Sequence, residues 1–247
     1  MMDRFADFCV IFISMVLGGG SLLLFGAFLI AGPYTIIPFE FSEGQALVWN
    51  GFLSLLFFIQ HSGMIRGGFR NRLASAVPNR YLPALYSIAS GIVLTTMVLL
   101  WQTSQTVLFR VQGPLETLFR AIALVAIAGF IWGVRALGSF DPYGRIPLVV
   151  HLRGRQLRPP EFVLRGPYLW VRHPLYFCML VLIWSVPSVT SDRLLFNVLW
   201  TVWIVIGSYL EERDAVAEFG ERYRDYQRTV PMLLPWRGPV GRALERP

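Results

Sequence analysis

Six long apolar runs, each almost free of Asp, Glu and Arg, alternate with polar stretches along this chain of 247 residues. A helix needs roughly 20 apolar residues to cross about 30 Å of hydrocarbon, and the runs approach or exceed that length. They cover residues 8–31, 44–65, 81–102, 118–137, 175–190 and 194–210. Backbone amides in lipid must be satisfied within each segment, and the alternating pattern of a closed barrel is absent. The pattern therefore predicts an all-α, polytopic membrane helix bundle with about six transmembrane helices.

The last two apolar runs are separated by only three polar residues, 191–193, so we expect them to form a tight helical hairpin. Charged residues gather in the two segments that flank this hairpin. Their placement makes the hairpin the expected functional unit. We accordingly divide the chain into an N-terminal four-helix membrane region, 1–138, and a C-terminal region, 139–247, that carries the chemistry.

The polar tail after the last run carries an apolar stripe. Val216, Phe219, Tyr223 and Tyr226 recur at steps of three and four, which is typical of an amphipathic helix. We expect that cytoplasmic helix over residues 213–228, lying against the membrane or the bundle. Prolines then end the helix, and the short apolar segment between them either covers a site or anchors the tail.

Composition and charge favour lipid surroundings. Hydrophobic residues make up 55% of the chain and charged residues 15%, whereas soluble domains carry about 25% charged residues. With six crossings and both termini cytoplasmic, nineteen of the 22 arginines lie on the cytoplasmic side, as the positive-inside rule predicts. This bias accounts for the net charge of +7, so we expect no nucleic-acid partner. Cys9 and Cys178 lack metal-ligand spacing, so we expect no metal.

The stretch with the most chemical content leads into the fifth apolar run and reads Arg165-Gly-Pro-Tyr-Leu-Trp-Val-Arg-His-Pro-Leu-Tyr176. Pro174 suits the first turn of a helix, where its missing amide hydrogen is not needed. His173 and Tyr176 are three residues apart and share a helix face. The amides and the positive dipole end at this helix start offer a docking place for a carboxylate.

Two adjacent carboxylates, Glu211 and Glu212, mark the cytoplasmic end of the sixth run, where the hairpin returns to the same surface. Adjacent helical residues point about 100° apart, so we expect only one of the two to look into the bundle, and the sequence leaves open which. Each feature alone has an anchoring explanation, such as Arg172 reaching lipid phosphates. Their ordered grouping on one side of the membrane favours a functional site.

Together these residues resemble the isoprenylcysteine carboxyl methyltransferase and phospholipid methyltransferase superfamily. The resemblance rests on Gly-Pro-Tyr-x-x-x-Arg-His-Pro-x-Tyr, the hairpin, and Glu-Glu-Arg-Asp followed by Phe219-Gly-x-x-Tyr-x-x-Tyr226. It implies methyl transfer from S-adenosylmethionine, held between the Arg-His-Pro turn, the hairpin and the Glu pair, with Arg172 and His173 in the reaction. The cofactor-binding residues on this interpretation are Tyr168, His173, Pro174, Tyr176, Glu211 and Glu212.

A second set of residues lies upstream, in Gln60-His-Ser-x-Met-x-Arg66, Val77-Pro-Asn-Arg-Tyr81, Trp101-Gln102 and Phe140-Asp-Pro-Tyr-Gly144. It resembles bacterial methanethiol S-methyltransferases and the related NnrU-type membrane proteins of denitrifiers. This resemblance implies a small thiol such as methanethiol as the acceptor and a bacterial inner membrane as the location, with the active site facing the cytoplasm.

His61 by itself is explained as a satisfied histidine near a helix end. Under the expected topology its helix ends on the cytoplasmic side, at the depth where the motif of the fifth helix begins, which makes it a catalytic candidate. If the acceptor is a thiol, His61 or His173 helps to remove its proton, because the thiolate is the nucleophile. Two alternatives stay open: methylation of a lipid or an isoprenylcysteine carboxylate, and a non-enzymatic NnrU-like component of nitrogen-oxide metabolism.

Overall fold

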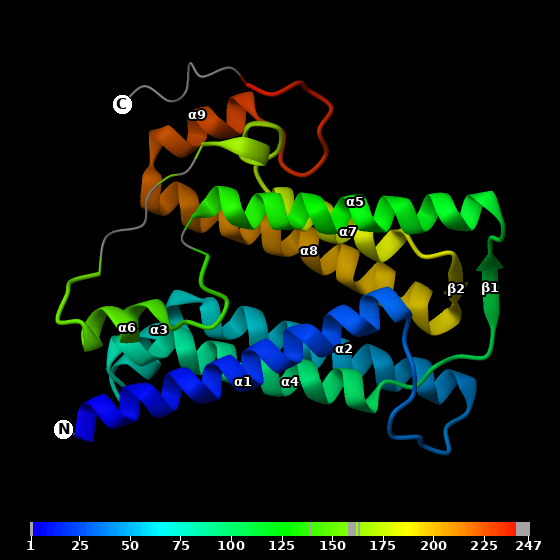
Figure 1. Cartoon of the computed structure of the whole chain (residues 1–247), viewed down its shortest axis with the longest axis horizontal. Coiled ribbons are helices and arrows are strands. Elements are labelled where there is room, and N and C mark those ends of the chain that lie inside the picture. Colours follow the sequence, from blue (N-terminus) through cyan, green and yellow to red (C-terminus); the bar gives the residue numbers. More distant parts are fainter. Residues whose placement is uncertain (1, 139, 158–161, 163, 241–247) are drawn as a thin grey trace. The chain divides into compact units, whose positions relative to one another are not determined.

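A computed structural model describes residues 2–138, 140–157, 162 and 164–240, and most of these are helical (Figure 1). In chain order the elements are α1 (Met2–Ala31), α2 (Glu43–Ile65), α3 (Gly67–Ala74), η1 (Asn79–Tyr81), α4 (Leu82–Leu100), β1 (Val107–Arg110), α5 (Pro114–Leu137), α6 (Ile146–Leu152), η2 (Gly166–Leu169), α7 (Pro174–Trp184), β2 (Ser188–Thr190), α8 (Ser191–Phe219) and α9 (Glu221–Thr229).

The chain divides into two compact units that interleave along the sequence. Unit 1 comprises Met1–Thr106, Asp141–Pro159 and Thr190–Phe196, and unit 2 comprises Val107–Phe140, Pro160–Val189 and Asn197–Pro247. Each unit is described by itself below. The expected functional division at residue 138 stays a prediction.

Within the residues that the structure describes, four helices are long and apolar enough to cross a membrane: Arg4–Ala31, Asn79–Leu100, Pro114–Leu137 and Ser191–Phe219. The expectation of a mostly helical membrane protein is therefore confirmed at this level. The run 44–65 is also helical, as α2, and the fifth run gives only the shorter apolar helix α7.

The expectation of a purely helical fold was wrong at two short strands, β1 in the connection between α4 and α5 and β2 in the connection between α7 and α8. The run 175–190 is helical only as far as Trp184. Pro187 follows three residues later, and the residue before a proline is disfavoured in helical geometry. Beyond it β2 pairs with β1 in a two-stranded sheet, and the Val111 amide donates to the Pro187 carbonyl oxygen at 2.9 Å.

The predicted polar turn at 191–193 was also wrong, because these residues form the first turn of α8. Asp192 is buried within unit 1, where its carboxylate accepts hydrogen bonds from the Trp101 indole N–H at 2.9 Å and the Ser104 amide at 3.1 Å. The Thr190 hydroxyl donates to the same carboxylate. A charged residue that has three donors within reach is stable in the interior, so the hydropathy pattern misplaced it.

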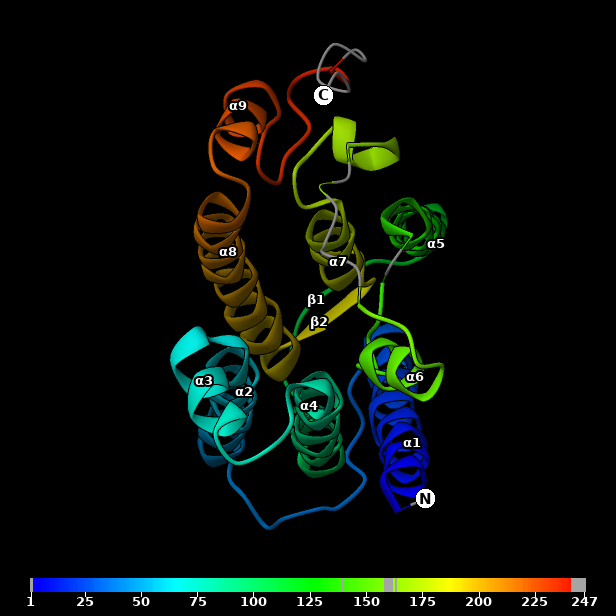
Figure 2. The ribbon, with the colours of Figure 1, turned by 90° about the vertical axis from the view of Figure 1, so that its left-hand side faces the viewer.

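Within unit 1, α1 and α2 each pack along α4 (Figure 2). Glycines set the spacing of α1 and α4. A Cβ atom on Gly91 would lie 2.6 Å from the Leu17 carbonyl oxygen, and one on Gly18 would lie 2.4 Å from the Ser87 hydroxyl. Small residues allow this close approach, which is how helices associate in membranes without a hydrophobic driving force.

An ionic cluster around a buried carboxylate lies near the start of α1 in unit 1. Asp7 of α1 has no exposed surface, and it accepts hydrogen bonds from the Tyr81 hydroxyl at 2.7 Å and from Arg80 Nε at 3.4 Å. Its other carboxylate oxygen lies 2.7 Å from His151 Nδ1 on α6. The cluster thus connects α1, η1 and α6.

Within unit 2, α5 packs against α7 and against η2. A Cβ on Gly133 would lie 2.6 Å from the Leu175 side chain, and one on Gly166 would lie 3.3 Å from the Trp132 indole nitrogen. The Arg165 guanidinium also donates to the Ala136 carbonyl oxygen at 2.5 Å. These contacts hold the turn before α7 against the C-terminal end of a candidate membrane span.

The predicted continuous helix over 213–228 is interrupted. The helix α8 ends at Phe219, Gly220 takes a φ of +59°, and α9 begins at Glu221. The residues of the apolar stripe nevertheless lie together, because Tyr223 and Tyr226 form a buried cluster onto which Phe219 packs, while an amphipathic helix lying against the membrane or the bundle stays a prediction. The buried members are Leu164, Tyr223, Tyr226 and Val230, with Phe162, Leu169, Ala215, Val216, Phe219 and Val240 packed around them.

Candidate active site

The start of α7 is organised as the sequence predicts. Pro174 is the first residue of the helix, and His173 occupies the N-cap position with a non-helical backbone, φ −121° and ψ 66°. Proline suits this position because the first helical amides lack partners within the helix. The residues just before it, through Arg172, lie in the turn that follows η2.

Arg172 is held entirely by other groups of unit 2. Its Nε lies 2.5 Å from Glu212 Oε1 and its Nη2 lies 3.1 Å from Oε2, a two-point pairing. Its Nη1 donates to the carbonyl oxygens of Gln227, at 2.9 Å, and of Val230. Because charge-assisted, two-point pairs fix orientation strongly, Arg172 joins the turn before α7 to α8 and to the end of α9.

His173 stands between the two carboxylates. Its side chain is 9% exposed, its Nδ1 lies 3.6 Å from Glu211 Oε2, and its Nε2 lies 3.3 Å from Glu212 Oε1 without the alignment of a hydrogen bond. The Tyr176 ring stacks on the imidazole with centroids 5.6 Å apart and planes 20° apart. Each ring nitrogen of His173 thus has a carboxylate oxygen of a different glutamate within 3.6 Å.

The two glutamates have different surroundings. Glu212 is 6% exposed, and besides Arg172 it accepts from the Gln227 amide at 2.8 Å. The Glu211 side chain is 52% exposed and accepts a hydrogen bond from the Tyr176 hydroxyl. The expectation that only one of the two glutamates faces the interior is confirmed, because Glu212 is buried and Glu211 is exposed. Both nonetheless reach His173, and Glu211 leaves carboxylate surface open to a ligand.

The segment after α9 pairs with the motif through its backbone. The Arg172 amide donates to the Pro231 carbonyl oxygen at 2.9 Å, and the His173 amide donates to the Met232 carbonyl oxygen at 3.1 Å. The Val240 amide donates to the Leu169 carbonyl oxygen at 3.0 Å. The apolar segment between the two prolines is therefore a structural neighbour of the motif rather than a free tail.

Buried tyrosines contact the Gly-Pro-Tyr part of the motif that precedes α7. The Tyr226 hydroxyl donates to the Tyr168 carbonyl oxygen at 2.6 Å. Burial raises the pKa of Tyr168, Tyr223 and Tyr226 above the ordinary value. These phenols therefore stay neutral and keep their hydroxyl protons for donation at physiological pH.

Gln227 and the carbonyl groups of Val230, Pro231 and Met232 were not predicted as part of the site. Backbone carbonyls carry no residue-type signature, so no composition or spacing signal marks them. The only hint in the sequence is that an apolar stretch bracketed by prolines follows a helix, and that pattern has many explanations.

The upstream candidate, His61, lies in α2 within unit 1. The Tyr86 hydroxyl lies 2.8 Å from its Nε2, and the Phe57 ring centroid is 5.0 Å away. The neighbouring Gln60 amide donates to the Ser90 hydroxyl at 3.3 Å. The structure thus places His61 in a polar contact between α2 and α4. The other predicted site residues all lie in unit 2, and a joint role of His61 with them stays a prediction.

The NnrU family profile, described as NnrU protein, matches residues 51–232. This chain belongs to the NnrU family. The match begins within α2 before His61 and ends at Met232, whose carbonyl oxygen receives the His173 amide. The family region therefore includes both sets of motif residues as well as the segment that follows α9.

Curated relatives of this NnrU-family chain carry one name. Methanethiol S-methyltransferase of a Pseudomonas species is 32% identical over 88% of this chain and 89% of its own length. Methanethiol S-methyltransferase 1 of Bradyrhizobium diazoefficiens is 32% identical over 81% of this chain and 70% of its own length. Methanethiol S-methyltransferase of Pseudomonas deceptionensis is 36% identical over 77% of this chain and 73% of its own length. No solved structure matches this chain significantly.

Proposed function

We propose that this NnrU-family protein is an integral membrane methyltransferase that transfers a methyl group from S-adenosylmethionine to a small thiol such as methanethiol. The name shared by relatives that align over most of their length supports this assignment. The observation that carries it is the arrangement of His173 between Glu211 and Glu212, with Glu211 half exposed.

The residues present fit this cofactor. Glu211 offers carboxylate surface to an amino or ribose group, and the rings of Tyr168 and Tyr176 form walls. His173 and the N-terminal end of α7 suit the carboxylate end. When bound, the cofactor supplies a methyl group on a positively charged sulfur. The chain contributes orientation, because methyl transfer is a displacement in line and depends on positioning more than on acid or base chemistry.

Arg172 takes a positioning role in this proposal. Its three nitrogens are all used by Glu212 and by the carbonyl groups near the end of α9. Because the guanidinium has these partners already, it orients Glu212 and, through its backbone amide, the segment after α9. The expectation that Arg172 takes part in the reaction stays a prediction, and the indirect role is the one we propose for it.

His61 is the proposed group that takes the proton of the thiol. The thiolate is the reactive form, so the proposal assigns removal of the thiol proton to the His61 imidazole, whose ring nitrogens face the Tyr86 hydroxyl. An isoprenylcysteine carboxylate is already ionised and would require no such base. A His61→Gln variant should therefore lose turnover of a thiol while keeping its affinity for the cofactor.

The topology that accompanies this function has six crossings, both termini in the cytoplasm and α9 as the amphipathic helix at the membrane surface, in a bacterial inner membrane. Four candidate spans and the 23 residues of α2 support five of these crossings, and the shorter apolar helix α7 would have to provide the sixth. The arginine distribution supports the orientation. Cysteine accessibility from each side of the membrane would test it.

Calorimetric titration of purified protein with S-adenosylmethionine tests the function first. We expect micromolar binding by the wild type and at least a tenfold loss in Glu211→Gln and His173→Ala. Glu218→Gln, an exposed glutamate on the same helix, is the matched control and should bind normally. Production of dimethyl sulfide from methanethiol then identifies the acceptor. A folded wild type that binds no cofactor overturns the proposal and favours a non-enzymatic NnrU component; binding with lipid or prenylcysteine methylation only would change the acceptor.

A further inference from the structure

Two stretches of unit 2, residues 168–173 and 230–240, run together and are called the paired segments here. Three backbone hydrogen bonds join them, from Arg172, His173 and Val240. Their inner side is buried, with Val230 at 1% and Leu233 at 7% exposure. The paired segments therefore form one local structure, and His173 is part of it.

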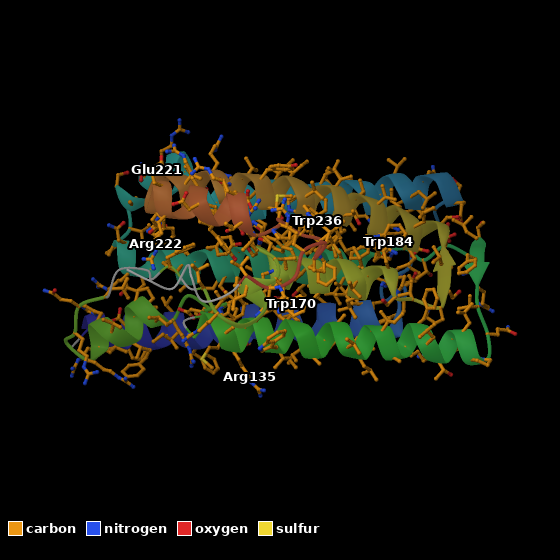
Figure 3. All side chains as sticks on the ribbon, turned by 90° about the horizontal axis from the view of Figure 1, so that it is seen from above. Arg135, Trp170, Trp184, Glu221, Arg222 and Trp236 are labelled. Atoms are coloured by element: carbon orange, nitrogen blue, oxygen red, sulfur yellow. The ribbon has the colours of Figure 1, made fainter. Side chains whose placement is uncertain are left out.

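Three large apolar side chains of the paired segments are exposed. Trp170 is 43% exposed, Leu234 is 57% exposed and Trp236 is 67% exposed. Figure 3 labels both tryptophans among the side chains. Tryptophan combines a large apolar ring with one N–H donor, so it favours surroundings that are partly apolar and partly wet.

The position of this surface follows from its link to α5. Arg165 donates to the Ala136 carbonyl oxygen, and Gly166 packs on Trp132, so η2 lies at the C-terminal end of a candidate membrane span. Trp170 immediately follows η2. It therefore stands where a span leaves the hydrocarbon, which is the depth at which tryptophans gather in membrane proteins.

The charge around this surface is positive. Residues 221–240 contain four arginines and two acidic residues, and Arg135 and Arg165 lie at the adjoining end of α5. Arg237 directly follows Trp236. Arginines beside exposed aromatic rings are complementary to a surface of anionic lipid headgroups.

We propose that Trp170, Leu234 and Trp236 dock the paired segments onto the headgroup region of an anionic lipid surface, with Arg237 contacting lipid phosphate. The segments hold the backbone of His173, so docking also stabilises the cofactor-binding turn. The docking stands on geometry alone; its effect on cofactor affinity rests on the proposed function.

Quenching of tryptophan fluorescence by lipids brominated near the glycerol end tests the docking without any cofactor. In bilayer discs, we expect the quenched share of the emission to fall in Trp170→Phe and in Trp236→Phe. Trp200→Phe removes a tryptophan that is buried in unit 2, and it should leave the quenched share unchanged or raised. If neither Trp170→Phe nor Trp236→Phe lowers the quenched share, the surface faces water or another protein, and the docking proposal is wrong.

Affinity for S-adenosylmethionine in discs of different charge tests the coupling. We expect at least threefold tighter binding with phosphatidylglycerol than with phosphatidylcholine alone, and the difference should vanish in a Trp236→Ser, Arg237→Gln variant. Equal affinity in both lipids, with normal quenching, would reject the coupling and leave the docking. Absence of binding in both lipids would instead count against the proposed function.

Discussion

Arg172 holds Glu212 with two nitrogens at once, Nε at 2.5 Å from Oε1 and Nη2 at 3.1 Å from Oε2, across forty residues of sequence. Both side chains are more than nine-tenths buried. The pair fixes the turn before α7 to α8, and the remaining arginine nitrogen fixes it to the end of α9. One contact thus assembles three separate stretches of the chain around His173.

Replacing Arg172 by alanine should destabilise the protein by about 3–5 kcal/mol, because a buried carboxylate would be left without its partner. Arg172→Lys should recover only part of this loss, since an ammonium cannot pair at two points. Thermal unfolding in detergent measures both. Arg213→Ala, which removes an exposed arginine on the same helix as Glu212, should stay within about 0.5 kcal/mol of the wild type. Equal melting temperatures for Arg172→Ala and Arg213→Ala would show that the buried pair contributes nothing.

The ionic cluster of unit 1 should depend on its buried member. Asp7→Asn removes the charge that Arg80 and His151 face, and we expect a loss of about 2 kcal/mol or more. His151→Gln removes a half-exposed partner and should cost less, about 1 kcal/mol or below. Chemical unfolding monitored by helical circular dichroism ranks the variants. A larger loss in His151→Gln than in Asp7→Asn would contradict this interpretation.

Gly144 and Gly154 form a matched pair for backbone strain. Both have positive φ, +64° and +63°, but a Cβ on Gly144 would lie 2.1 Å from the Pro83 backbone, whereas one on Gly154 meets open space. Gly144→Ala should therefore cost about 3 kcal/mol or more, from strain and overlap together. Gly154→Ala should cost only about 1–2 kcal/mol. The difference between their melting temperatures measures the overlap itself, and similar melting temperatures would disprove the close approach.

Tyr226 gives the stability a dependence on alkaline pH. Its folded pKa lies above the ordinary value of about 10, so folding favours the neutral phenol, and this contribution is present below pH ~10 and is lost as pH rises above it. Tyr226→Phe should cost about 1 kcal/mol at neutral pH, because the hydrogen bond to Tyr168 disappears. The difference in the free energy of unfolding between Tyr226→Phe and the wild type should become smaller above pH ~10, and chemical unfolding at several pH values would measure it. A difference that is constant with pH would mean that Tyr226 ionises equally in both states.

The apolar runs by themselves determined that this chain is a helical membrane protein, because lipid requires every backbone group to be satisfied locally. The position of Pro174 likewise fixed the start of α7, since proline has one favourable place at the beginning of a helix. The spacing of Tyr223 and Tyr226 determined their shared face even though Gly220 interrupts the helix. These are local properties, and local sequence is sufficient for them.

Only the tertiary structure decided where polar groups find their partners. Asp192 reads as part of an exposed turn, yet Trp101 and Ser104, about ninety residues earlier, supply the donors that allow its burial. The choice between Glu211 and Glu212 depended on the direction from which Arg172 approaches, which helical periodicity cannot give. The backbone hydrogen bond between His173 and Met232 could not be predicted from the residue types, because every residue has a carbonyl group. Hydrogen bonds between distant segments depend on how the chain returns upon itself, and that information is spread over the whole sequence rather than held in any one motif.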